Sequence, residues 1–141
     1  MCKENRIKLN VEAKTWEEAI YKAAEILEED GVIKPSYKDA IIESTKKTGP
    51  YYVITKGVAM PHARPEDGVI KSGFCFLKLK EGVYFGSKEN DPVKYIFMVA
   101  MENNEKHIEF IQFLSDLMEN EEFYKAVDEN RPIEEIKSFF K

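Results

Sequence analysis

The pattern of apolar and polar positions predicts where the strands of this chain lie. Apolar side chains at every second position predict a strand at residues 7–11, and an aromatic and β-branched run predicts another at residues 51–54. Residues 58–60 either continue that strand or form a separate one, and residues 73–79 predict the next. Residues 93–101 are almost unbroken apolar sequence, which is typical of a central strand covered on both faces.

Helical spacing of apolar residues predicts helices on either side of these strands. The first is expected from the capping residue Thr15 to Gly31, and the second from Pro35 to Gly49. Three more are expected after the central strand: one beginning near residues 105–107, whose apolar face includes Ile108 and Ile111, one holding Phe123 and Val127, and one opened by Pro132. The order β-α-α-β-β-β-α-α-α predicts a single α/β domain over residues 1–141, with helices on both faces of one mixed sheet.

Glycine and proline predict the connections between these elements. Residues 80–82 contain a glycine between polar residues and are expected to form a turn that ends the strand at 73–79. Pro61 is expected to end the apolar run at 58–60, because proline has no backbone donor for a strand ladder. Residues 65–68 then form a turn.

Composition and charge exclude several classes of function. A formal net charge of −5 argues against a nucleic-acid-binding protein, and no stripe of basic residues alternates with aromatic ones. Cys2 and Cys75 are too few for a disulfide framework, and Cys75 is expected to be a small core residue. Neither a membrane-spanning apolar run nor a signal peptide is present, so we expect a cytoplasmic protein without direct membrane insertion.

Candidate chemistry is concentrated where the apolar run at 58–60 ends. His62 follows Pro61 and comes two residues before Arg64, so an imidazole is expected at the end of a rigid element, beside a cation and a turn. Near neutral pH an ordinary imidazole keeps one nitrogen unprotonated. His62 could therefore act as a nucleophile, a base or a ligand.

The second histidine is expected in the first turn of the helix that follows the central strand. If the strand before His62 neighbours the central strand, His62 and His107 lie at the same edge of the sheet. A helix N-terminus favours a nearby anion and keeps an imidazole neutral. Together the two histidines describe an anion pocket of phosphate size that contains a nucleophile.

Other interpretations remain open on the residues alone. His62 could be an ordinary turn residue, His107 a solvated first-turn residue, and Lys46 and Lys47 cations that only complement the end of their helix. A zinc site is not supported, because the histidines are far apart and no third ligand has recognisable spacing. No P-loop, Rossmann glycine set or nucleophile elbow is present.

Three ordered sequence blocks resemble one protein family. The blocks are GPYYVI followed by GVAMPHARPEDGV (49–54 and 57–69), FGSKENDPV (85–93) and HIEFIQFL (107–114). They resemble the enzyme IIA domain of the phosphoenolpyruvate-dependent sugar phosphotransferase system, mannitol/fructose structural type, ascorbate-like branch. This resemblance implies a three-layer α/β/α sandwich around a mixed sheet.

The resemblance also implies a function and its residues. In the family, the histidine matching His62 accepts a phosphoryl group from the phosphocarrier HPr and passes it to a cysteine of enzyme IIB. The histidine matching His107 stabilises the phosphorylated form. The chain would be a phosphotransferase component that needs no cofactor or metal and that serves ascorbate or a related sugar. A regulatory module, whose phosphorylation controls binding to another protein, is the alternative.

Cations are expected to flank the phosphorylated histidine. Arg64 is near it in sequence, and many relatives carry an arginine at about the position of Lys46 or Lys47. Lysine can offset the charge of a phosphate but cannot form the planar two-point contact of arginine. We therefore expect phosphate-binding roles for Arg64 and for one of these lysines.

Overall fold

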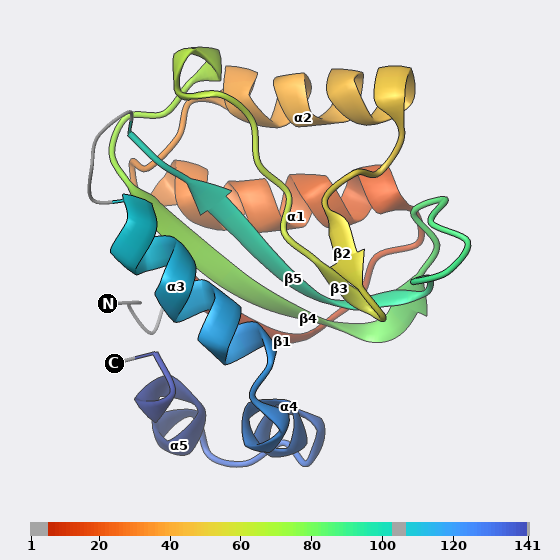
Figure 1. Cartoon of the computed structure of the whole chain (residues 1–141), viewed down its shortest axis with the longest axis vertical. Coiled ribbons are helices and arrows are strands. Elements are labelled where there is room, and N and C mark those ends of the chain that lie inside the picture. The colour runs from red at the N-terminus through yellow and green to blue at the C-terminus, as the bar shows by residue number, and fades with distance from the viewer. Residues whose placement is uncertain (1–5, 103–106, 141) are drawn as a thin grey trace.

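A mixed five-stranded sheet forms the middle layer of the protein. The computed structural model describes residues 6–102 and 107–140 (Figure 1). The strands are β1 (Ile7–Val11), β2 (Val53–Thr55), β3 (Val58–Ala59), β4 (Gly73–Val83) and β5 (Val93–Ala100). The helices are α1 (Trp16–Glu29), α2 (Pro35–Thr48), α3 (His107–Met118), α4 (Glu121–Asp128) and α5 (Ile133–Ser138).

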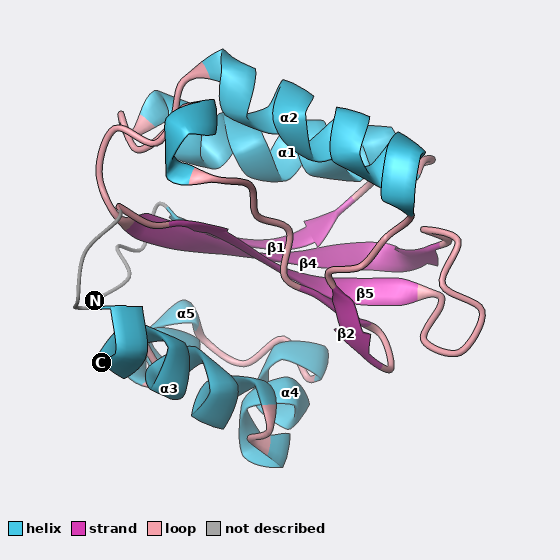
Figure 2. Cartoon of the chain, turned by 45° about the horizontal axis from the view of Figure 1, so that its top comes forward, coloured by secondary structure: helices cyan, strands magenta, loops and turns pink. Residues whose placement is uncertain are grey.

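Helices cover both faces of this sheet. The strand order is β1-β4-β5-β3-β2; β1 pairs with β4 in parallel and β3 with β5 in parallel, whereas β4–β5 and β2–β3 are antiparallel. Helices α1 and α2 lie on one face, and α3, α4 and α5 lie on the other (Figure 2). The predicted three-layer α/β/α fold is therefore confirmed. None of the described helices is long and apolar enough to span a bilayer.

The central strand β5 separates the two halves of the core. Ile96 and Met98 belong to the cluster under α1 and α2, while Phe97 and Val99 belong to the cluster under α3 to α5. This alternation is the period of a strand covered on both faces, as its unbroken apolar sequence predicted. Cys75, on the neighbouring β4, is fully buried in the first cluster, as expected.

The ends of α1 form as the sequence predicted. The Thr15 hydroxyl accepts a hydrogen bond from the Glu18 backbone N–H at 3.2 Å. The Glu18 carboxylate reaches back to the N–H of Lys14 at 3.3 Å, one residue earlier than a standard capping box. At the other end Gly31 has φ +69°, where a side chain would be strained, and the chain leaves the helix there.

The turn expected at residues 80–82 is wrong, because β4 continues to Val83. Its register with β5 shifts between Lys78 and Val83, which marks a bulge rather than a reversal. Gly82 lies against Pro92, the residue just before β5: a Cβ built on Gly82 would be 2.6 Å from the Cβ of Pro92. The glycine serves a close approach between strands and not a turn.

The alternatives left open for residues 51–60 are decided in favour of two separate strands. β2 and β3 form an antiparallel hairpin around Gly57, whose φ of +76° favours glycine at this bend. Tyr51 and Tyr52 precede β2 in a turn and were predicted to belong to it. β3 then pairs in parallel with β5, so the strand before His62 does neighbour the central strand.

Candidate functional site

His62 lies just beyond the end of β3, at the edge where β5 also ends. Hydrogen bonds from neighbouring elements hold the connecting segment, which has no regular secondary structure: Val99 N–H, for example, donates to the Pro61 carbonyl at 3.1 Å. His62 itself is only partly buried. The topology thus puts an accessible imidazole on a segment held by the central strand.

The imidazole ring has a defined orientation. Its Nδ1 lies 2.8 Å from the carbonyl oxygen of Met60. Since a carbonyl can only accept, Nδ1 carries the proton and donates in this contact. The unprotonated nitrogen of the neutral ring is therefore Nε2, which has a lone pair available for a nucleophilic step.

Two tyrosines contact the His62 segment directly. The Tyr51 ring stands at 90° to the imidazole with centroids 5.6 Å apart, and its hydroxyl donates to the His62 carbonyl at 3.0 Å. The Tyr37 hydroxyl accepts from the Ala63 N–H at 2.9 Å and donates to the Val99 carbonyl at 2.6 Å. The sequence predicted no site role for either tyrosine.

A hollow of ≈ 230 Å³ opens beside His62. The residues lining it come from α2, the ends of β3 and β5, the following loops and α3: Tyr37, Met60, His62, Ala63, Pro65, Val99, Met101, Ile111 and Leu114. Apart from the imidazole and the Tyr37 hydroxyl, these side chains are apolar. Ile111 and its neighbour Ile108 were predicted to face the core through helical spacing, but they are 52% and 78% exposed.

His107 is the first residue of α3, so its backbone lies where the sequence placed it, at the start of the helix that follows the central strand. Ile111, which lines the hollow, comes four residues later, and positions four apart share a helix face. The side chain of His107 lies outside the described part of the structure. Its role therefore stays a prediction.

A second hollow of ≈ 370 Å³ adjoins the first, and Ala63 lines both. Its lining comprises Ala40, Glu43, Ser44, Lys47, Thr48, Tyr51, Ala63, Arg64 and Asp67. The predicted cations Arg64 and Lys47 thus line the same hollow, together with Tyr51. Neither is among the described residues that line the His62 hollow. Lys46, the residue before Lys47 in the last turn of α2, is not among the described residues that line either hollow.

The two cations of the second hollow differ in their partners. The Arg64 side chain, 74% exposed, contacts Asp67 through Nε at 3.3 Å and Nη2 at 3.3 Å, and Glu66 through Nε at 3.5 Å. These contacts hold the pKa of the Asp67 carboxyl below its ordinary value, the hydrogen bond from Arg64 being the main cause. Lys47 has no ion-pair partner within residues 6–102 and 107–140. Its charge is the less compensated of the two.

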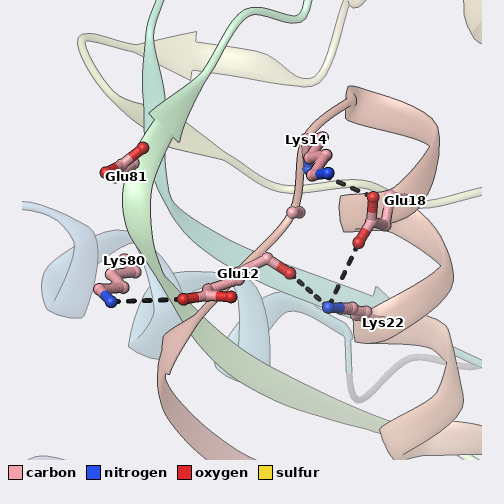
Figure 3. A pocket seen from close by; sticks show the side chains of 7 residues that line it. Glu12, Lys14, Glu18, Lys22, Lys80 and Glu81 are labelled. Carbon is pink, nitrogen blue, oxygen red and sulfur yellow. Dashed lines mark hydrogen bonds and ion pairs between the residues drawn. The ribbon is translucent and has the colours of Figure 1, made fainter.

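A third hollow, of ≈ 260 Å³, is lined mainly by charged residues, and acidic and basic side chains of this lining pair with one another (Figure 3). Lys22 pairs with Glu18 at 3.3 Å and donates to the Glu12 carbonyl, and Lys80 pairs with the Glu12 carboxylate at 3.3 Å. No group of three His, Cys, Asp or Glu side chains that could hold a metal occurs in the part of the chain that the structure describes. The His62 region remains the best candidate.

Comparison with known proteins identifies the family of the chain. The sequence model of the phosphoenolpyruvate-dependent sugar phosphotransferase system EIIA 2 family matches residues 1–141. The chain is 36% identical over 137 residues to the ascorbate-specific PTS system EIIA component of Escherichia coli (strain K12), covering 96% of this chain and 89% of that protein.

Solved structures give the same result. The crystal structure of IIA mannitol from Escherichia coli superposes with a TM-score of 0.82 at 31% identity, covering 100% of this chain and 99% of that one. The complex of enzyme IIA mannitol with phosphorylated enzyme IIB mannitol from the same organism gives a TM-score of 0.82 at 31% identity, with 99% and 96% covered. The chain therefore belongs to the EIIA 2 family of the phosphoenolpyruvate-dependent sugar phosphotransferase system, a family of phosphotransferase components.

Proposed function

We propose that this protein is a phosphocarrier in which Nε2 of His62 accepts a phosphoryl group from HPr and passes it to a cysteine of enzyme IIB. The observation that carries the proposal is the contact between His62 Nδ1 and the Met60 carbonyl, which leaves Nε2 as the nucleophilic nitrogen. The relative that was solved in complex with phosphorylated enzyme IIB supports the choice of acceptor.

Both transfers balance without a cofactor. In the first, the Nε2 lone pair forms an N–P bond while the N–P bond of the phosphorylated donor histidine breaks, and its electron pair returns to the donor ring. In the second, a thiolate of the acceptor attacks phosphorus and the N–P electron pair returns to Nε2. Nδ1 keeps its proton throughout, and its bond to Met60 holds the ring in line.

Positive groups near His62 would offset the charge of the phosphoryl group. Lys47, with no ion-pair partner among the described residues, is the better candidate in the second hollow, whereas Asp67 and Glu66 compensate much of the charge of Arg64. His107, at the start of α3, would stabilise the phosphorylated form. These roles are ones of positioning and charge screening, which phosphoryl transfer mainly requires.

The exposed isoleucines beside the site suit a carrier that must dock partners. Ile111 lines the His62 hollow and Ile108 lies one position from His107, and both side chains are mostly exposed. Apolar surface next to a nucleophile would be covered when HPr or enzyme IIB binds. The carrier would act in the cytoplasm, where these partners meet.

The transported substrate is proposed to be ascorbate or a related sugar. This assignment rests on the relative from Escherichia coli, which is an ascorbate-specific component, and on the sequence blocks around His62. A regulatory module, whose phosphorylation controls binding to another protein, is the second candidate. The partial exposure of His62 favours the carrier, because a carrier must present the phosphoryl group to an acceptor.

The proposal is tested by reconstituting the relay. The protein is incubated with phosphoenolpyruvate, enzyme I and HPr, and intact mass is measured before and after adding enzyme IIB. We expect one acid-labile phosphoryl group on the wild type, its loss to enzyme IIB, and none on His62→Ala. Phosphorylation of His62→Ala to the same extent as the wild type would refute the proposal. A phosphorylated wild type that transfers no phosphoryl group to enzyme IIB would favour the regulatory module.

A further inference from the structure

The peptide bond that joins His62 to Ala63 is held at both of its polar atoms by side chains. The Tyr51 hydroxyl donates to the carbonyl of this peptide at 3.0 Å, and the Tyr37 hydroxyl accepts from its N–H at 2.9 Å. The two phenols come from different elements: Tyr37 from α2 and Tyr51 from the turn before β2. This peptide lies outside the strands, and two side-chain hydroxyls thus supply the hydrogen bonds of its carbonyl and its N–H.

The Tyr37 hydroxyl links this peptide to the central strand. It is fully buried, and its single proton goes to the nearer acceptor, the Val99 carbonyl at 2.6 Å, while the Ala63 carbonyl lies at 3.3 Å. Burial raises the pKa of this hydroxyl to about 12, so it stays protonated at neutral pH and can donate and accept at once. The His62 segment is thereby fixed relative to β5.

Tyr51 holds the other side of the same peptide and also contacts the ring. Its hydroxyl fixes the carbonyl, and its ring stands perpendicular to the imidazole at 5.6 Å. Because 48% of Tyr51 is exposed, its hydroxyl is not required to satisfy a buried group of its own. The contact is better explained by what it does to His62 than by the packing of Tyr51.

These contacts leave little freedom to the nucleophile. A peptide unit is planar, so fixing its carbonyl and its N–H fixes the plane that carries the His62 Cα. The Nδ1 bond to Met60 then fixes the ring on that backbone. We propose that Tyr37 and Tyr51 are positioning residues, which hold the His62–Ala63 peptide so that Nε2 points into the hollow for phosphoryl transfer; this inference rests on the proposed carrier function.

The test compares Tyr37→Phe and Tyr51→Phe with the matched control Tyr52→Phe. Tyr52 is as buried as Tyr37, and its hydroxyl contacts Thr45 at 2.8 Å on α2 instead of the His62 segment. Each substitution removes one hydroxyl and keeps the ring. Two quantities are measured: the rate of a single transfer from phosphorylated HPr, and the ¹⁵N imidazole spectrum of the unphosphorylated protein.

We expect Tyr37→Phe and Tyr51→Phe each to slow transfer about threefold to tenfold, the effect of losing one hydrogen bond. In both, the fraction of His62 protonated at Nδ1 should fall. Tyr52→Phe should lower the unfolding midpoint as Tyr37→Phe does while leaving the transfer rate and the spectrum unchanged. If Tyr37→Phe does not fold, Tyr51→Phe carries the test, because its side chain is half-exposed.

Wild-type rates in Tyr51→Phe and Tyr37→Phe would overturn the inference, and so would an equal slowing in Tyr52→Phe. Failure of the proposed function is a separate result. If the wild type accepts no phosphate from HPr, the carrier role is wrong. The imidazole spectrum still reports whether the two hydroxyls orient His62.

Discussion

Replacing Lys47 by methionine should slow phosphoryl transfer from HPr, whereas the same change at Lys46 should not. The two lysines are adjacent in the last turn of α2, but only Lys47 lines the hollow that adjoins His62. Methionine keeps the length of the apolar stem and removes the charge. Both variants lose a similar interaction with the helix C-terminus, so their stabilities should match.

The exposure of Lys47 sets the expected loss of transfer rate in Lys47→Met. A phosphohistidine carries close to two negative charges, and a charged hydrogen bond to it would be worth about 1.5–3 kcal/mol if buried. Lys47 is exposed in an open hollow, and pairs of exposed charges are worth about 0–1 kcal/mol. We therefore expect a loss of about fivefold for Lys47→Met at low salt, and less than about twofold for Lys46→Met.

The assay is rapid-quench transfer from phosphorylated HPr at two ionic strengths. The difference between wild type and Lys47→Met should shrink as salt rises, because screening acts on exposed charges. Equal rates for Lys47→Met and Lys46→Met at low salt would refute this assignment of the cation. A larger loss in Lys46→Met would point to a different face of α2.

Three further predictions concern the fold and the turn beside the site. Thr15→Ala should lower the free energy of unfolding by about 1 kcal/mol in urea titrations, because the Glu18 N–H loses its cap; no change would contradict the capping role. Phe123→Ala should cost about 3–5 kcal/mol in the same assay, since its ring is fully buried among other aromatic rings. Arg64 lowers the pKa of Asp67, so the ionised carboxyl stabilises the fold above its ordinary pKa and this stabilisation is lost as pH falls. Asp67→Asn should therefore flatten the acid side of the melting-temperature profile, and an unchanged profile would contradict the pairing.

Local sequence was sufficient where local chemistry decides the structure. Thr15 and Gly31 marked the ends of α1 because a cap and a left-handed residue act within a few positions. The unbroken apolar run marked β5 because a strand buried on both faces has no polar side. Since β3 and β5 pair in parallel, the edge position of His62 followed from the same patterns.

Distant contacts account for what the sequence did not predict. The local sequence predicted a turn at Gly82, because the residues around it do not reveal that Pro92, ten positions later, packs against it. Helical spacing predicted a core position for Ile111, yet the sheet edge leaves it beside an open hollow. Apolar periodicity reports burial on a helix face only if another element covers that face.

The arrangement around His62 was predicted only in part for the same reason. Tyr37 contacts Ala63 and Val99 across long stretches of chain, and periodicity can predict that a tyrosine is buried but not where its hydroxyl bonds. The choice between Lys46 and Lys47 depends on the direction in which α2 packs, which adjacent positions do not reveal. The sequence predicted an anion pocket of phosphate size at the two histidines. It did not predict that the hollow beside His62 would be lined mainly by apolar side chains.

Locating the phosphoryl group on the imidazole would test directly whether His62 carries it through Nε2. The protein is labelled with ¹⁵N-histidine, phosphorylated through enzyme I and HPr, and its ring nitrogens are assigned by ¹H–¹⁵N and ³¹P spectra. We expect phosphorus on Nε2 of His62, with Nδ1 still protonated and bound to the Met60 carbonyl. Phosphorus on Nδ1 of His62, or on His107, would contradict it.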